Sequence, residues 1–110
     1  MTQVERESSL EEFFRKRVRL VGGYTIKLAP TERGVPDRLV VLGGRMFLVE
    51  LKAEDGELSP IQVVWHTRLR ERHGVRVHVL YGRTDVVRWL REAVDTMCLP
   101  SDPVDDFGPA

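Results

Sequence analysis

Two carboxylates and one ammonium group are spaced along this sequence in a way that suits hydrolysis of a phosphodiester bond. Asp37 follows Gly34-Val35-Pro36, and thirteen residues after it comes the triplet Glu50-Leu51-Lys52. Carboxylate oxygens are preferred ligands of hard divalent cations, and a neighbouring lysine can act on an attacking water or on developing negative charge. Asp37 and Glu50 are therefore candidate metal ligands, and Lys52 is a candidate catalytic residue.

A predicted β-hairpin explains how these groups would meet. Two apolar runs flank Gly43-Gly44, which tolerates the positive φ of a tight turn, so strands are expected at residues 37–43 and 46–52. Side chains alternate along a strand, which puts Glu50 and Lys52 on one face. A surface salt bridge between these two residues is the alternative. It is disfavoured because the strand is otherwise apolar, and burying an unpartnered carboxylate is costly.

The remaining residues alternate between helix and strand patterns. The expected order is helix, three strands, helix, strand, helix, which is an α/β fold with a mixed central β-sheet flanked by helices. Outside the hairpin, the expected elements are a helix at 4–21, a strand at 23–29, a helix at 59–73, a strand at 75–81 and a helix at 83–95.

The first expected helix carries two acids near its apolar stripe. Glu7 falls between Phe14 and Val18 on that stripe, and Glu11 lies at its edge. Glu11 has a second interpretation, because Ser8 and Glu11 have the spacing of a capping box that would start the helix later. We therefore favour Glu7 as a third acid of the site and keep Glu11 as its substitute.

The segment Ser59-Pro60-Ile61-Gln62 is a strong signal for the start of a helix. Ser59 is a suitable N-cap, Pro60 suits the first helical position, and Gln62 completes a capping box. Capping alone is a complete structural explanation of Gln62.

The helix that follows is expected to turn Ile61, Trp65 and Leu69 towards the core. His66 and His73 lie on its flank, where they are expected to be solvated or at the edge of the core. Their spacing of seven residues matches no zinc-binding motif.

Charge is distributed unevenly along the chain. All 17 lysine and arginine residues, 14 of them arginine, precede Asp95, together with 13 of the 17 acids. Arginine suits bidentate phosphate contacts, so the basic body indicates nucleic acid in combination with the candidate metal site. Lys27, Arg33 and Arg38 are the candidate DNA-binding residues, although solvation alone would also explain Lys27.

Length and composition indicate one globular domain, at residues 1–95, followed by an acidic tail at 96–110 that we expect to be disordered. The chain has 110 residues and is 42% apolar and 31% charged. Apolar runs fall short of the roughly 20 residues that cross a bilayer, and Cys98 is the single cysteine. We expect a cytoplasmic protein with no membrane partner.

Several motifs resemble, in order and spacing, those of the VRR-NUC nuclease family over residues 5–95. They are Glu7-Ser8-Ser9-Leu10-Glu11, Gly22-Gly23, Gly34-Val35-Pro36-Asp37-Arg38, Phe47-Leu48-Val49-Glu50-Leu51-Lys52 and Leu58-Ser59-Pro60-Ile61-Gln62. The length is similar to that of stand-alone, virus-type members. The resemblance implies a restriction-endonuclease-like core of the PD-(D/E)xK type.

The resemblance also assigns roles to residues of the hairpin. Asp37 and Glu50 become metal ligands together with the backbone carbonyl of Leu51, and Lys52 becomes the residue that orients or deprotonates water. Outside the hairpin, it makes Gln62 a helper in the active site and Glu7 the acid from the first helix.

The function implied is that of a DNA endonuclease dependent on Mg²⁺ or Mn²⁺. Stand-alone members resemble Holliday-junction resolvases, and a small domain acting on branched DNA would act as a homodimer. A flap or nicking endonuclease is the first alternative. A non-catalytic DNA-binding subunit is the second, but it would not need Asp37, Glu50 and Lys52 together.

Overall fold

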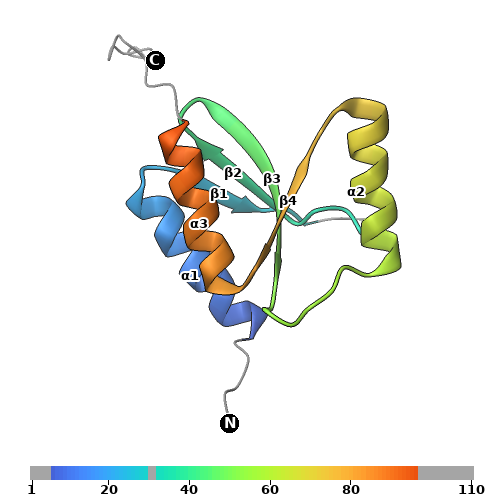
Figure 1. Ribbon diagram of the computed structural model, residues 1–110, viewed down its shortest axis with the longest axis horizontal. Helices are drawn as coiled ribbons and strands as arrows, with labels where there is room; N and C mark the ends of the chain where they lie inside the picture. The colour runs from blue at the N-terminus through green and yellow to red at the C-terminus, as the bar shows by residue number, and fades with distance from the viewer. Residues whose placement is uncertain (1–5, 30–31, 97–110) are drawn as a thin grey trace.

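The computed structural model of the protein describes residues 6–29 and 32–96. It contains three helices and four strands in the predicted order (Figure 1). Most of the predicted tail lies outside the described residues. The elements are α1 (Glu7–Leu20), β1 (Tyr24–Lys27), β2 (Arg38–Leu42), β3 (Arg45–Lys52), α2 (Pro60–His73), β4 (Val77–Tyr81) and α3 (Gly82–Asp95).

The strands form one mixed sheet, as predicted, in the order β1-β2-β3-β4. The first three strands are antiparallel, whereas β4 runs parallel to β3 after the crossover through α2. Gly43 and Gly44 make the hairpin turn with positive φ angles of 59° and 77°. This turn sets the register in which Arg38 pairs with Val49, at the far end of the hairpin.

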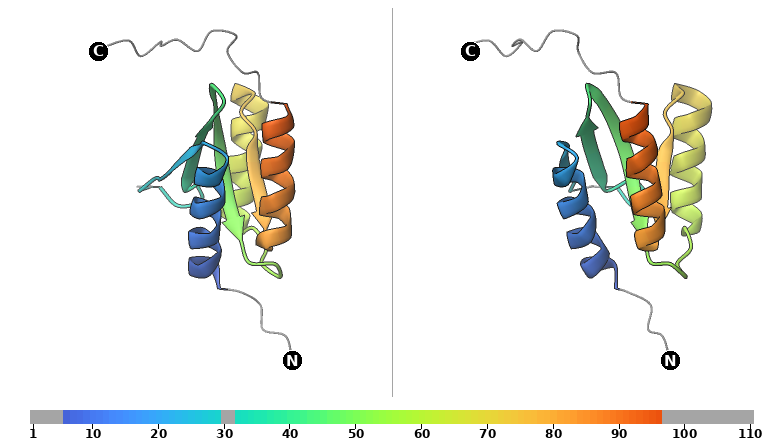
Figure 2. Two further views of the ribbon diagram at one scale, coloured as in Figure 1. Left: turned by 90° about the vertical axis from the view of Figure 1, so that its left-hand side faces the viewer. Right: turned by 60° about the vertical axis from the view of Figure 1, so that its left-hand side comes forward.

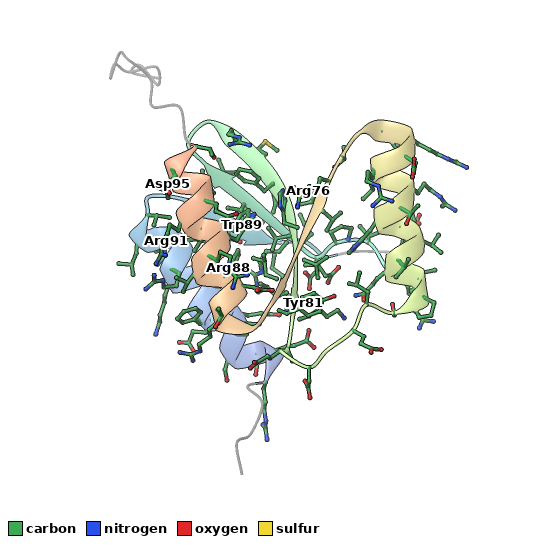
Figure 3. All side chains as sticks on the ribbon, in the orientation of Figure 1. Arg76, Tyr81, Arg88, Trp89, Arg91 and Asp95 are labelled. Atoms are coloured by element: carbon green, nitrogen blue, oxygen red, sulfur yellow. The ribbon has the colours of Figure 1, made fainter. Side chains whose placement is uncertain are left out.

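Helices α1 and α3 pack side by side on one face of the sheet (Figure 2). Burial of apolar side chains between these helices and the sheet supplies the main stabilisation of the fold. Trp89, labelled on α3 in Figure 3, packs edge-on against Phe47 of β3 with ring centroids 5.2 Å apart. The buried apolar residues are Leu10, Phe14, Val18, Val40, Leu42, Phe47, Val49, Leu51, Leu80, Val86 and Leu90.

Helix α2 stands apart from the other two helices and contacts β4 (Figure 1). The expectation that Ile61, Trp65 and Leu69 face the core is wrong. Ile61 is 44% exposed, the other two are half-buried, and the buried residue of this helix is His66. Apolar residues occur all around α2, so their periodicity does not single out the face that packs.

The loop before β2 packs against the start of α2. Gly34 has a φ of +87°, and a side chain there would lie 2.7 Å from both the Ile61 carbonyl oxygen and Trp65 Cδ1. A residue with a side chain would therefore be strained in its backbone and crowded by α2. This close approach holds the segment that carries Asp37 against α2.

The sheet face opposite α1 and α3 is partly exposed. Tyr24, Val41 and Met46 are direct cross-strand neighbours on this face and are 60%, 37% and 68% exposed. Ile26 lies on the same face of β1 and is also exposed. The apolar residues of β1 thus face outwards, while Thr25 and Lys27 point towards α1. Within the described part of the chain, no helix is long and apolar enough to cross a membrane.

Candidate active site

Asp37 and Glu50 are adjacent where β2 begins and β3 approaches its end. Asp37 directly precedes Arg38 and Glu50 directly follows Val49, which are the last paired residues of the hairpin. The backbone carbonyl of Asp37 accepts a hydrogen bond of 2.7 Å from the N–H of Leu28, which anchors the segment. The structure therefore brings the two predicted acids together.

Both carboxylates have a buried oxygen without a hydrogen-bond partner among the described residues. These atoms are Oδ1 of Asp37 and Oε1 of Glu50. Burial is the main cause that raises the pKa of Glu50 to about 7, and repulsion by Asp37 adds to it. Burial likewise raises the pKa of Asp37, opposed mainly by the nearby Arg38. A site of this kind gains stability when a cation is shared between the two acids.

The donor set fits a hard divalent cation. Two neighbouring carboxylates each have a buried oxygen that forms no hydrogen bond with the described residues, and oxygen is the donor such ions prefer. The described residues contain no group of three or more histidine, cysteine, aspartate or glutamate side chains placed to bind a metal. Water or substrate oxygens would therefore complete the coordination, as is usual for Mg²⁺. The carbonyl of Leu51 as a further ligand stays a prediction.

Lys52 lies two residues beyond Glu50 on the same face of β3. It is half-buried and pairs with Tyr81 across to β4. Its positive charge opposes the rise in the pKa of Glu50, and it adds to the effect of burial in lowering the pKa of His66. An ammonium group in this position can stabilise an anion that approaches the carboxylate pair.

Gln62 forms the predicted capping box at the start of α2. Its Oε1 accepts a hydrogen bond of 2.8 Å from the Ser59 backbone N–H, and its own backbone N–H donates to Ser59 Oγ at 3.2 Å. The structure thus shows the capping role of Gln62. Its role as a helper in the active site stays a prediction.

The two acids of α1 have different surroundings. The helix begins at Glu7 without a side-chain cap, so the capping box considered for Ser8 and Glu11 is not formed. Glu7 is exposed, yet its charge contributes to the raised pKa of Glu50. Glu11 is bound instead by Lys27, at 3.3 Å, and by Arg38, at 3.4 Å. Glu7 therefore remains the better candidate for a helix-borne acid.

The three predicted DNA-binding residues differ in exposure. Lys27 and Arg33 are exposed, and Lys27 is paired with Glu11. Arg38 is 2% exposed and donates hydrogen bonds to Glu11 and Thr25, so its contacts are internal. Their role in DNA binding stays a prediction, and the burial of Arg38 favours a part in shaping the site.

His66 is a residue of the site that sequence reasoning missed. Its Nε2 lies 3.4 Å from Oε1 of Glu50, and both side chains are at least nine-tenths buried. His66 also borders a groove of about 440 Å³ between α2 and β4, which is lined in part by Arg70 and Arg76. The signal in the sequence was a histidine one turn after Gln62, on the same side of the helix.

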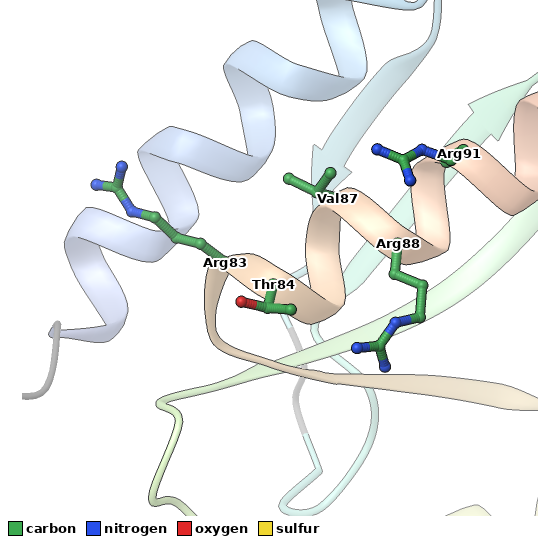
Figure 4. Close-up of a pocket in the computed structure, with 5 residues that line it drawn as sticks. All are labelled: Arg83, Thr84, Val87, Arg88 and Arg91. Atoms are coloured by element: carbon green, nitrogen blue, oxygen red, sulfur yellow. The ribbon is translucent and has the colours of Figure 1, made fainter.

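A second group of arginines lies away from the site, on α3. Arg83, Arg88 and Arg91 border a shallow depression of about 390 Å³, with side chains that point in different directions (Figure 4). Arg88 pairs with Asp85 at 3.6 Å, and Arg83 stacks over the ring of Phe13. These residues do not converge on one ligand and lie on the sheet face opposite Glu50.

Comparisons with known proteins agree with this geometry. A solved structure described as a VRR_NUC domain superimposes with a TM-score of 0.69 and 31% sequence identity, covering 77% of this chain and 94% of that one. A protein named "Putative nuclease p44", from Acyrthosiphon pisum secondary endosymbiont phage 1, is 44% identical over 66 residues, which are 58% of this chain and 71% of the relative. No model of a protein family matches the chain.

Proposed function

The chain belongs to the VRR-NUC family of nucleases, and we propose that it is a Mg²⁺- or Mn²⁺-dependent endonuclease that hydrolyses phosphodiester bonds in branched DNA, with the Holliday junction as its substrate. The observation that carries this proposal is the carboxylate pair. Asp37 and Glu50 each have a buried oxygen that forms no hydrogen bond with the described residues, beside the ammonium group of Lys52. A salt-bridged structural pair would instead satisfy these atoms.

Each residue of the site has a distinct task in this proposal. Asp37 and Glu50 would hold the cation, which supplies charge neutralisation and a more acidic bound water. Lys52 orients the attacking water and stabilises the negative charge that develops on the phosphoryl oxygens. Gln62 assists from the first turn of α2, and Glu7 adds negative charge from α1.

A homodimer would let a domain of this size cut two strands of a junction. The exposed row of Tyr24, Val41 and Met46 supports this part of the proposal, because it forms an apolar strip across three strands. The strip lies on the same sheet face as Glu50, but at the opposite end of β3. A second copy docked there by a two-fold axis would leave both active sites open.

Cleavage of synthetic DNA tests the proposal directly. We expect four-way junctions to be cut at symmetric positions in Mg²⁺ or Mn²⁺ and to stay intact in EDTA. Linear duplexes should be cut far more slowly. Asp37→Asn and Glu50→Gln should each abolish cleavage while the protein still unfolds cooperatively, because each removes an anionic ligand but no core contact.

Two results would contradict this proposal in different ways. Wild-type cleavage rates for either neutral variant at saturating Mg²⁺ would overturn the metal assignment. A single incision by one protomer, with flaps cut faster than junctions, would overturn the junction assignment and favour a flap nuclease.

A further inference from the structure

His66 and Glu50 form a buried contact beside the carboxylate pair. Nε2 of His66 lies 3.4 Å from Oε1 of Glu50, and their side chains are 10% and 5% exposed. Neither atom has a hydrogen-bond partner among the described residues. Buried polar atoms without partners are rare in folded proteins because they cost free energy.

The contact is slightly longer than an N–H···O hydrogen bond, whose usual length is about 2.7–3.2 Å. A small adjustment of either side chain would close it. A neutral imidazole carries one N–H, on either Nδ1 or Nε2. That hydrogen must be on Nε2 if the ring is to donate to Glu50.

We propose that His66 is a positioning residue, whose Nε2–H holds Oε1 of Glu50 and thereby aims the second carboxylate oxygen, Oε2, at the cation. The inference rests on the metal-dependent function proposed above. Oxygen ligands of metals are commonly oriented by a hydrogen bond from a neighbouring side chain, and loss of that bond weakens binding of the metal.

The position of His66 suits this task. It sits one turn after the capping box that fixes the start of α2, and the loop at Gly34 packs against the same end of the helix. The ring is therefore carried by a helix whose first turns are held at two points. Val79 of β4 is paired with Glu50 in the sheet, so the backbone that carries the carboxylate is also held in place.

Three variants at matched positions separate positioning from packing. His66→Leu introduces an apolar side chain of similar size and removes the donor, whereas His66→Gln keeps an N–H that can reach Glu50. His73→Leu changes an exposed histidine on the same helix and serves as the control. Mn²⁺ binding is measured by isothermal titration calorimetry and cleavage by its dependence on Mn²⁺ concentration.

We expect His66→Leu to weaken Mn²⁺ binding about tenfold or more and to shift the metal dependence of cleavage by a similar factor. His66→Gln should recover most of the loss, and His73→Leu should bind as the wild type does. We expect the two His66 variants to have comparable melting temperatures. A difference in metal binding between them would then come from the N–H donor and not from packing.

Nuclear magnetic resonance gives a readout that needs no metal and no activity. Long-range ¹H–¹⁵N spectra of the metal-free protein should show His66 as the Nε2–H form. The signals are assigned by their absence in His66→Leu. His78 provides an internal reference for this form, because its Nδ1 accepts a hydrogen bond of 3.1 Å from Trp89 Nε1.

The outcomes distinguish this inference from the function on which it rests. A wild-type protein that cleaves DNA with Mn²⁺, alongside a His66→Leu variant with unchanged metal affinity, would overturn the role of His66 alone. The Nδ1–H form of His66 would do the same. A wild-type protein that binds no Mn²⁺ would overturn both.

Discussion

The side-chain oxygen of Gln62 accepts a hydrogen bond of 2.8 Å from the backbone N–H of Ser59, so the predicted catalytic helper is also half of a helix cap. The reciprocal bond, from the Gln62 N–H to Ser59 Oγ, measures 3.2 Å. One side chain can serve both roles if its amide N–H groups act on substrate while its oxygen caps the helix, or if it moves between the two roles.

Comparing Ser59→Ala with Gln62→Ala separates these two roles. Each variant loses one bond of the capping box, so both should lose about 1 kcal/mol in the free energy of unfolding. Gln62→Ala alone should also slow the cleavage of DNA at saturating substrate. Urea titration and single-turnover kinetics measure the two effects. Equal cleavage rates in the two variants would show that Gln62 acts only as part of the helix cap.

Replacing Lys52 by alanine should lower turnover much more than affinity for DNA. Removal of a group that acts on the reacting atoms costs about 100-fold or more in rate, whereas one cation among 17 contributes little to the overall field. Single-turnover rates and binding to labelled junctions in Ca²⁺ are the measurements. Arg33→Ala, on an exposed loop residue, is the control and should mainly weaken binding. Equal losses in rate and affinity for Lys52→Ala would reduce Lys52 to a phosphate contact.

The metal-free wild type should lose stability relative to Glu50→Gln as pH rises from about 4.5 to about 7. Burial and the charge of Asp37 raise the pKa of Glu50 from 4.5 to about 7. In this window the folded protein retains a proton that the unfolded chain has released. The contribution of this group to stability is therefore present below pH 4.5 and lost as pH passes 7.

Urea unfolding in EDTA at several pH values measures this difference. At pH 8 we expect Glu50→Gln to be more stable than the wild type by up to about 3 kcal/mol. The lowered pKa values of His66 and His78 make stability rise with pH, which opposes the effect of Glu50. Both histidines are present in the two proteins, so the difference in their free energies of unfolding is the readout. If the free energies of unfolding of the two proteins changed in parallel from pH 4 to pH 8, the pKa of Glu50 would not be raised by burial.

Charges on the exposed sheet face should dissociate the proposed dimer. Met46→Glu combined with Val41→Glu puts two like charges at paired positions of β2 and β3, where a second copy would bury them. We expect at least tenfold weaker dimerisation, measured by light scattering, and single incisions in place of symmetric ones. Val64→Glu, on the exposed surface of α2, is the control. Unchanged dimerisation of the double variant would place the interface elsewhere.

Local patterns in the sequence were sufficient to predict the hairpin and the positions of its two acids. A two-glycine turn between apolar runs determines the register of β2 and β3, and this register puts Asp37 beside Glu50. The order of elements and the capping box of α2 were also predicted correctly, because periodicity, turn residues and caps are properties of neighbouring residues.

The orientation of α2 was decided only by the tertiary structure. Its apolar residues lie all around the helix, so the sequence does not favour one face, and packing of the Gly34 loop and β4 selects the face that carries His66. Burial of Arg38 is a second example, because it depends on Glu11 and Thr25, which are distant in sequence. Contacts between distant segments determine which polar side chains are buried, and these contacts cannot be predicted from local periodicity.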